Sequence, residues 1–151
     1  MVTVDMVTYT ENLETVTVPR HKREDLEAVL SPYELKLFRG ICGKLQWLVA
    51  QVRLDLSYAV STLQAELRSP TIGSLLRAIG VVRQAQLRKD FCLTFRPLDL
   101  QGAGVMTITD AALGNVAEDG SATEIAAKRV GSQSAYWVVL ADEVLLSGKR
   151  G

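Results

Sequence analysis

Residues 31–52, SPYELKLFRGICGKLQWLVAQV, do more than any other stretch to determine how this chain folds. Ser31 as N-cap, Pro32 at the first helical position and Glu34 three residues after the cap form a capping box. Apolar side chains then recur every three or four residues, at Leu35, Phe38, Ile41, Cys42, Leu45, Leu48, Val49 and Val52. This stripe predicts one amphipathic helix that ends near Val52 and buries its apolar face against a partner surface.

Two further helices are predicted after this one. The second begins near Asp55, whose short carboxylate side chain is a candidate N-cap. Ser69-Pro70-Thr71 ends the second helix and caps the third. The positions that form the inward stripes of these helices are Leu56, Val60, Leu63 and Leu67, then Leu75, Ile79, Val82 and Gln86 or Leu87.

Strand-like patterns flank the helices. The segments with the β-branched and aromatic composition of strands are residues 91–95, 105–109, 135–141 and 144–146. Asp110 directly follows the second of them, and residues 114–132 have the composition of a polar loop. Residues 1–18 alternate β-branched and polar residues, which indicates short extended pieces. Three helices followed by antiparallel strands predict an α+β fold.

The charge is balanced overall but not along the chain. The 151 residues include 17 basic and 17 acidic ones, and the 48% hydrophobic share excludes a wholly disordered chain. Residues 31–96, however, hold ten basic and four acidic residues, whereas the segments on either side are acidic. A basic segment of this kind indicates either a surface that faces nucleic acid or helices whose basic residues are solvated.

The sequence contains no signal for a membrane. The N-terminus lacks the basic and apolar regions of a signal peptide, and the longest apolar run, residues 135–141, is far shorter than the ~20 residues that span a bilayer. Cys42 and Cys92 lie far apart, which fits a reducing compartment better than a disulfide scaffold. We therefore expect an intracellular protein, in the cytoplasm or nucleus, with no membrane partner.

Few residue types here support metal or phosphate chemistry. His21 is the only histidine, lies in a charged connector, and has no second histidine with which to form a zinc site. Gly102 and Gly104 lack the third glycine and the following helix of a phosphate-binding loop. Gly40 and Gly43 fall inside the first helix, where we expect them to allow close helix packing.

Asp110 is the one candidate for a catalytic residue. An aspartate at the end of a strand most often forms a turn. A carboxylate in that position is also a metal ligand in two-metal hydrolases, but that chemistry needs several converging carboxylates. The nearby acids Glu118, Asp119 and Glu124 lie in the predicted loop, which is a poor platform for such a site.

Several motifs occur in a fixed order along the chain. They are Phe38-Arg39-Gly40, Gly43-Lys44-Leu45-Gln46-Trp47-Leu48, Arg53-Leu54-Asp55-Leu56-Ser57-Tyr58-Ala59-Val60, Ser69-Pro70-Thr71, Thr109-Asp110-Ala111, and Ser132-Gln133-Ser134 leading into Tyr136-Trp137-Val138-Val139-Leu140. In this order they resemble the Pol polyprotein of copia-type LTR retrotransposons, from the end of the reverse-transcriptase palm into RNase H. Leu54, where the family has proline, and Ala112, where serine is common, depart from the pattern.

The resemblance implies three regions in this chain. Residues 1–30 would be the end of a palm-like segment and a connector, residues 31–90 a helical thumb/connection-like region of about three helices, and residues 91–151 the N-terminal strands of a truncated RNase H-like domain. The intact parent copies RNA into DNA and degrades the RNA strand of RNA–DNA hybrids with Mg²⁺. Asp110 corresponds to the first of its RNase H carboxylates, and the other carboxylates and the polymerase aspartates lie outside this chain.

These correspondences predict binding without catalysis. One carboxylate does not hold two hydrated Mg²⁺ ions, so we expect no cofactor for this chain alone. Candidate phosphate contacts are Arg77, Arg83, Arg88 and Lys89, in a salt-dependent complex with an RNA–DNA hybrid or template–primer duplex. Their alternative interpretation is a solvated helix face. An incomplete sheet would also expose an apolar face and edge, and so favour self-association. A protein-binding module and a decayed relic without function remain as alternatives.

Overall fold

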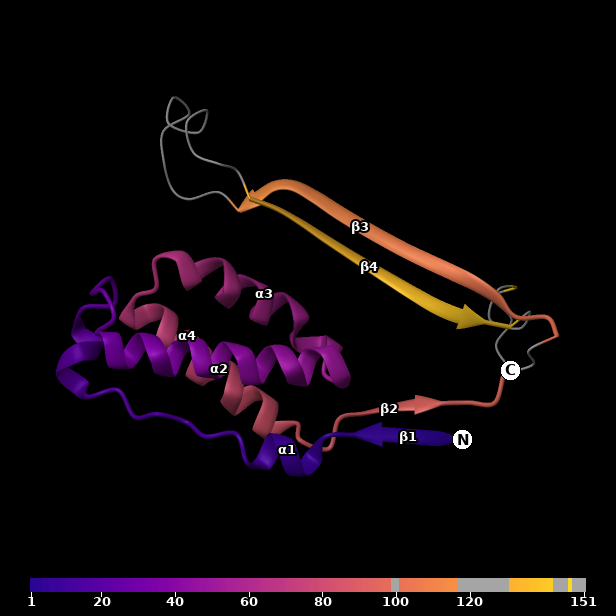
Figure 1. The fold of residues 1–151 in the computed structure, drawn as a ribbon, viewed down its shortest axis with the longest axis horizontal. Helices are drawn as coiled ribbons and strands as arrows, with labels where there is room; N and C mark the ends of the chain where they lie inside the picture. The colour runs from indigo at the N-terminus through magenta and orange to yellow at the C-terminus, as the bar shows by residue number, and fades with distance from the viewer. Residues whose placement is uncertain (99–100, 117–130, 143–146, 148–151) are drawn as a thin grey trace. The chain divides into compact units, whose positions relative to one another are not determined.

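A computed structural model describes residues 1–98, 101–116, 131–142 and 147 of the chain (Figure 1). The chain divides into two units, Met1–Arg96 and Pro97–Gly151. Within the described residues, four α-helices, all in the first unit, accompany two antiparallel two-stranded sheets. The α+β fold class predicted from the sequence is therefore confirmed.

Helix α2 (Pro32–Gln51) begins as the sequence predicts. The hydroxyl of Ser31 accepts a hydrogen bond from the backbone N–H of Glu34 at 3.4 Å, and the carboxylate of Glu34 accepts one from the backbone N–H of Ser31 at 2.9 Å. This reciprocal pair satisfies N–H groups that the start of a helix otherwise leaves without partners. The helix ends at Gln51, so the predicted capping box and length are both confirmed.

The core of the first unit lies where α2 packs against α3 (Ser57–Ala65) and α4 (Ile72–Leu87). Phe38, Leu45 and Leu48 of α2 are completely buried, each 0% exposed. The other buried core residues are Leu13, Val18, Leu30, Ile41, Cys42, Val49, Leu56, Val60, Leu63, Ile72, Leu75, Ala78, Ile79, Val82 and Ala85. Burial of this apolar surface is the main term that stabilises the helical unit.

Helices α3 and α4 form in the predicted segments, with one correction. Thr71 caps α4 as expected, because its hydroxyl accepts a hydrogen bond from the backbone N–H of Ser74 at 3.4 Å. Asp55 does not cap the second helix. It lies in the 3-10 turn η2 (Leu54–Leu56), and α3 begins at Ser57 without a side-chain cap. The physical reason is that both carboxylate oxygens of Asp55 accept hydrogen bonds from Arg53.

The N-terminal residues close the first unit with a small sheet. Strand β1 (Val2–Asp5) pairs antiparallel with β2 (Cys92–Phe95), so the two ends of the unit lie side by side (Figure 1). The resemblance assigns residues 91–95 to the RNase H-like strands, whereas in this structure Cys92–Phe95 pair with the N-terminal strand. Between β1 and α2 lie helix α1 (Val7–Glu11) and the 3-10 turn η1 (Arg20–Glu24), where extended pieces and a connector were expected.

The second unit is a two-stranded ribbon of β3 (Gly104–Val116) and β4 (Gly131–Ala141). Both strands were predicted, but they are longer than expected because the pairing continues beyond Asp110 to Val116 opposite Gly131. Asp110 therefore lies inside a strand, opposite Ala135, and not at a strand end. Residues 117–130, in the predicted loop, and the predicted strand 144–146 lie outside the described residues.

Candidate nucleic-acid interface

Two of the four predicted phosphate contacts are paired with acids of the same unit. Arg77 Nη2 lies 2.7 Å from Glu66 Oε2, which joins α4 to the 3-10 turn η3 (Glu66–Arg68). Lys89 Nζ lies 2.5 Å from Glu11 Oε1 on α1, and this hydrogen bond raises the pKa of Lys89. Both cations are thus neutralised in part by the protein itself.

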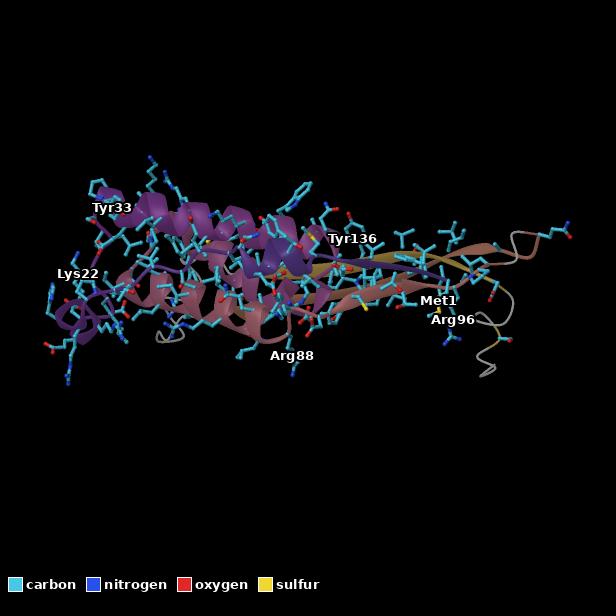
Figure 2. All side chains as sticks on the ribbon, turned by 90° about the horizontal axis from the view of Figure 1, so that it is seen from below. Met1, Lys22, Tyr33, Arg88, Arg96 and Tyr136 are labelled. Atoms are coloured by element: carbon cyan, nitrogen blue, oxygen red, sulfur yellow. The ribbon has the colours of Figure 1, made fainter. Side chains whose placement is uncertain are left out.

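Arg83 and Arg88 differ from that pair because both are exposed and neither forms an ion pair within the part of the chain that the structure describes. Figure 2 shows the Arg88 side chain pointing outward beyond the end of α4. An exposed guanidinium without a carboxylate partner can donate paired hydrogen bonds to phosphate oxygens. Of the four predicted contacts, Arg83 and Arg88 are therefore the two whose guanidinium groups can bind a phosphate without first leaving a described carboxylate.

A second basic surface, not predicted from the sequence, lies on α2. We call it the outward face of α2, and it consists of Lys36, Arg39, Gly40, Gly43 and Trp47. All five residues are exposed, and Trp47 is 54% exposed despite its large apolar ring. Neither of its two basic side chains forms an ion pair with a described carboxylate. Two free cations and an exposed indole therefore share one side of a rigid helix.

Gly40 and Gly43 do not lie at a helix–helix contact, so the prediction that they allow close helix packing is wrong. A Cβ atom built on Gly40 or Gly43 would meet no atom within 4 Å, so no neighbouring helix requires a glycine there. A glycine inside a helix costs about 0.5–1 kcal/mol relative to alanine. Their exposure could be predicted from the sequence, because Gly40 and Gly43 lie on the side of the helix opposite its apolar stripe.

Internal ion pairs leave the basic excess of the helical unit in place. Glu34, Asp55 and Glu66 are three of the four acids among residues 31–96. Each is held by one cation, at 2.7 Å from Lys22, 2.8 Å from Arg53 and 2.7 Å from Arg77 respectively. Lys44 and Lys89 of the same segment are paired with Glu14 and Glu11. The cations of this segment that form no ion pair with a described carboxylate, and are available to an external anion, are Lys36, Arg39, Arg68, Arg83, Arg88 and Arg96.

Arg53 is the most deeply buried charged residue in the described chain, only 1% exposed. Its Nε and Nη2 donate to the two carboxylate oxygens of Asp55 at 2.8 and 2.9 Å. Its Nη1 donates to the backbone carbonyls of Ala85 at 2.9 Å and Arg88 at 3.1 Å, and its guanidinium lies 5.3 Å from the centre of the Phe91 ring. One side chain thus joins the end of α2 to the end of α4.

These contacts explain the electrostatics of the pair. The hydrogen bonds from Arg53 are the main reason that the pKa of Asp55 is lowered, and the nearby charge of Arg88 lowers it further. A carboxylate that accepts two N–H bonds from a planar guanidinium stays ionised, and the pair is stabilised by its geometry as well as its charge. Arg53 and Asp55, both in a motif of the resemblance, are therefore structural residues in this fold.

Asp110 belongs to no metal-binding cluster among the described residues. It is exposed on β3, and the described residues contain no group of three or more His, Cys, Asp or Glu side chains that could hold a metal ion. Glu118, Asp119 and Glu124 lie outside the described residues. His21 is exposed in η1 and likewise belongs to no such group among the described residues.

Comparisons with known proteins add no family assignment: no family model, curated protein or solved structure matches this chain. Among the described residues, no helix is both long enough and apolar enough to cross a membrane.

Proposed function

We propose that this chain is the thumb- and connection-like part of a copia-type reverse transcriptase, followed by the first strands of its RNase H-like domain. Its own activity, on this proposal, is to bind an RNA–DNA hybrid or a template–primer duplex through the phosphate backbones. Asp110 becomes a Mg²⁺ ligand only in a longer polypeptide that supplies the other carboxylates.

The outward face of α2 is the observation that supports this proposal most directly. Lys36 and Arg39 supply positive charge, which attracts phosphates and displaces their counterions. The open surface at Gly40 and Gly43 allows a sugar–phosphate backbone to approach the helix axis closely. Trp47 adds an apolar ring that can pack against a sugar or a base. Such a surface binds nucleic acid without reading its sequence.

The basic residues of α4 provide a second set of contacts in the same unit. Arg83 and Arg88 are exposed and unpaired within the described chain, whereas Arg77 and Lys89 must first leave Glu66 and Glu11 to reach a phosphate. We therefore propose Arg83 and Arg88 as the stronger contacts of α4, and Arg77 and Lys89 as weaker ones.

Charge reversal on α2 tests the proposal. Fluorescence anisotropy with a labelled RNA–DNA hybrid compares the wild type, the double variant Lys36→Glu/Arg39→Glu and a matched control, Arg20→Glu/Arg68→Glu. The control changes the net charge by the same amount at two exposed residues outside α2 and α4. The slope of log K against log salt is expected to become shallower by about 0.9 for each lost phosphate contact, and only in the α2 variant. Equal weakening in both variants contradicts the proposal.

A second candidate function is self-association through the β3–β4 ribbon. Val105, Tyr136, Val138 and Leu140 lie on one face by the strand register and are all exposed, and Ile108 and Trp137 are exposed on the other. A ribbon with apolar side chains on both faces favours burial against another sheet. Sedimentation equilibrium tests it, and a monomer at every concentration contradicts it.

A further inference from the structure

We infer that Arg53 is a positioning residue of the nucleic-acid surface: by occupying the carboxylate of Asp55, it keeps the side chain of Arg88 available to a phosphate. The inference rests on the proposed function, since it assigns a role within the same surface. Arg53 itself is 1% exposed, so it does not contact nucleic acid and can act only through its neighbours.

The first step concerns the backbone at the end of α4. The last carbonyl groups of a helix have no intrahelical partner. Arg53 Nη1 donates to the carbonyl of Ala85 and to that of the C-cap residue Arg88, which also accept backbone N–H bonds at 3.2 Å from Arg88 and Phe91 respectively, and a cation in this position also interacts favourably with the helix dipole. The backbone from which the Arg88 side chain projects is therefore held by Arg53.

The second step concerns competition for the Arg88 side chain. The carboxylate of Asp55 and the backbone carbonyl of Arg88 accept hydrogen bonds from the same guanidinium of Arg53, at 2.8 to 3.1 Å, so the two residues lie close together, and the charge of Arg88 lowers the pKa of the Asp55 carboxyl group. Both oxygens of Asp55, however, are already bound by Nε and Nη2 of Arg53. Without that guanidinium, Arg88 is the other cation whose charge acts on the carboxylate. An Asp55–Arg88 pair would then remove one cation from the surface.

The third step is that lysine cannot replace Arg53. A planar guanidinium directs separate N–H groups at the two oxygens of Asp55 and at the two carbonyls of α4. A lysine ammonium is a single point with three donors and does not satisfy this arrangement. Arg53→Lys should therefore leave an oxygen of Asp55 without its hydrogen bond, although the positive charge is kept.

The test measures the salt dependence of hybrid binding by the full chain. The probe is a labelled RNA–DNA hybrid, and the readout is the slope of log K against log KCl at a temperature where circular dichroism shows each variant folded. Arg88→Gln and Arg53→Met are each expected to make the slope shallower by about 0.9, which corresponds to one phosphate contact. The double variant Arg53→Met/Arg88→Gln should show no further loss, because Arg53 acts through Arg88.

Removing the competing carboxylate of Asp55 should restore the salt dependence that Arg53→Met reduces. Arg53→Met/Asp55→Asn still lacks the guanidinium but has no anion to capture Arg88, so its slope should return to that of the wild type. A role limited to stability would lower the unfolding midpoint of Arg53→Met without any change of slope in the folded protein. If Arg53→Met does not fold, Arg53→Lys with and without Asp55→Asn gives the same comparison.

The possible outcomes separate this inference from the proposed function. A wild-type chain without salt-dependent hybrid binding overturns both. If the wild type binds but Arg88→Gln keeps the full slope, or if the folded Arg53 variant keeps it, only the inference about Arg53 is overturned. A reduced slope that Asp55→Asn restores supports the inference.

Discussion

Lys22 Nζ lies 2.7 Å from Glu34 Oε1 and ties the 3-10 turn η1 to the first turn of α2. Glu34 also accepts hydrogen bonds from the backbone N–H and the hydroxyl of Ser31, at 2.9 and 2.6 Å. The same carboxylate therefore completes the capping box and anchors the preceding segment. It lies at the start of a helix, where negative charge is favourable.

This pair predicts an acid-sensitive component of stability. The hydrogen bond from Lys22 is the largest of the causes that lower the pKa of Glu34 from 4.5 to about 2. Because the folded pKa is depressed, the contribution is fully present above pH 4.5 and is lost as the pH falls toward 2. Glu34→Gln keeps a side-chain acceptor for the capping box but does not titrate. The difference between the urea midpoints of the wild type and Glu34→Gln should shrink as the pH falls from 4.5 to about 2. A difference that stays constant over this range would contradict the proposed role of the ionised Glu34.

The buried face of α2 predicts a large loss of stability at Leu45. This side chain is 0% exposed in the core, and a Leu→Ala change at such a site costs about 2–5 kcal/mol. Tyr58→Ala is the matched control on α3, where the side chain is 71% exposed and the cost should stay within about 0.5 kcal/mol. Urea unfolding measures both. Similar losses for the two variants would show that Leu45 is not part of the core.

The open surface at Gly43 predicts opposite effects on stability and binding. Gly43→Ala should stabilise the helix by about 0.5–1 kcal/mol, because the added methyl group meets no atom within 4 Å. It should also weaken binding to an RNA–DNA hybrid, because that methyl group lies where the phosphate backbone would approach. Gly80→Ala is the stability control, since its Cβ also meets nothing within 4 Å. A gain in stability with unchanged hybrid affinity would remove Gly43 from the proposed surface.

The resemblance assigns only one RNase H carboxylate, Asp110, to this chain, and from it we predict that the polypeptide alone does not cleave an RNA–DNA hybrid. Two-metal cleavage needs several carboxylates around a pair of Mg²⁺ ions. A labelled RNA–DNA hybrid incubated with the chain and Mg²⁺ or Mn²⁺ should stay intact on a denaturing gel. Cleavage that Asp110→Asn abolishes would refute the prediction. Cleavage that survives this change would point to a contaminating nuclease.

Local patterns made part of this fold predictable from the sequence. The capping boxes at Ser31 and Thr71 join residues three positions apart, so the sequence shows both partners at once. The apolar stripe of α2 likewise follows from helical periodicity alone. The segments that these signals specify formed helices as predicted.

Long-range contacts account for what the sequence did not show. Arg53 donates to the carbonyl of Ala85, 32 residues away, so its role in joining the ends of α2 and α4 is not visible in a local motif, although its partner Asp55 is only two residues away. The position of Asp110 inside β3 depends on pairing with residues near Ala135. The exposed position of Gly40 and Gly43 follows from the sequence alone, because helical periodicity places them opposite the apolar stripe.

The central claim, that the basic helical unit binds nucleic acid through phosphates, is tested most directly by the salt dependence of hybrid binding by the wild-type chain. The affinity for a labelled RNA–DNA hybrid is measured between about 50 and 200 mM KCl, where phosphate-dependent binding changes most visibly. Contacts from Lys36, Arg39, Arg83 and Arg88 together predict a slope of log K against log salt of about −3 to −4. A slope near zero, or no binding at the lowest salt concentration, would contradict the account.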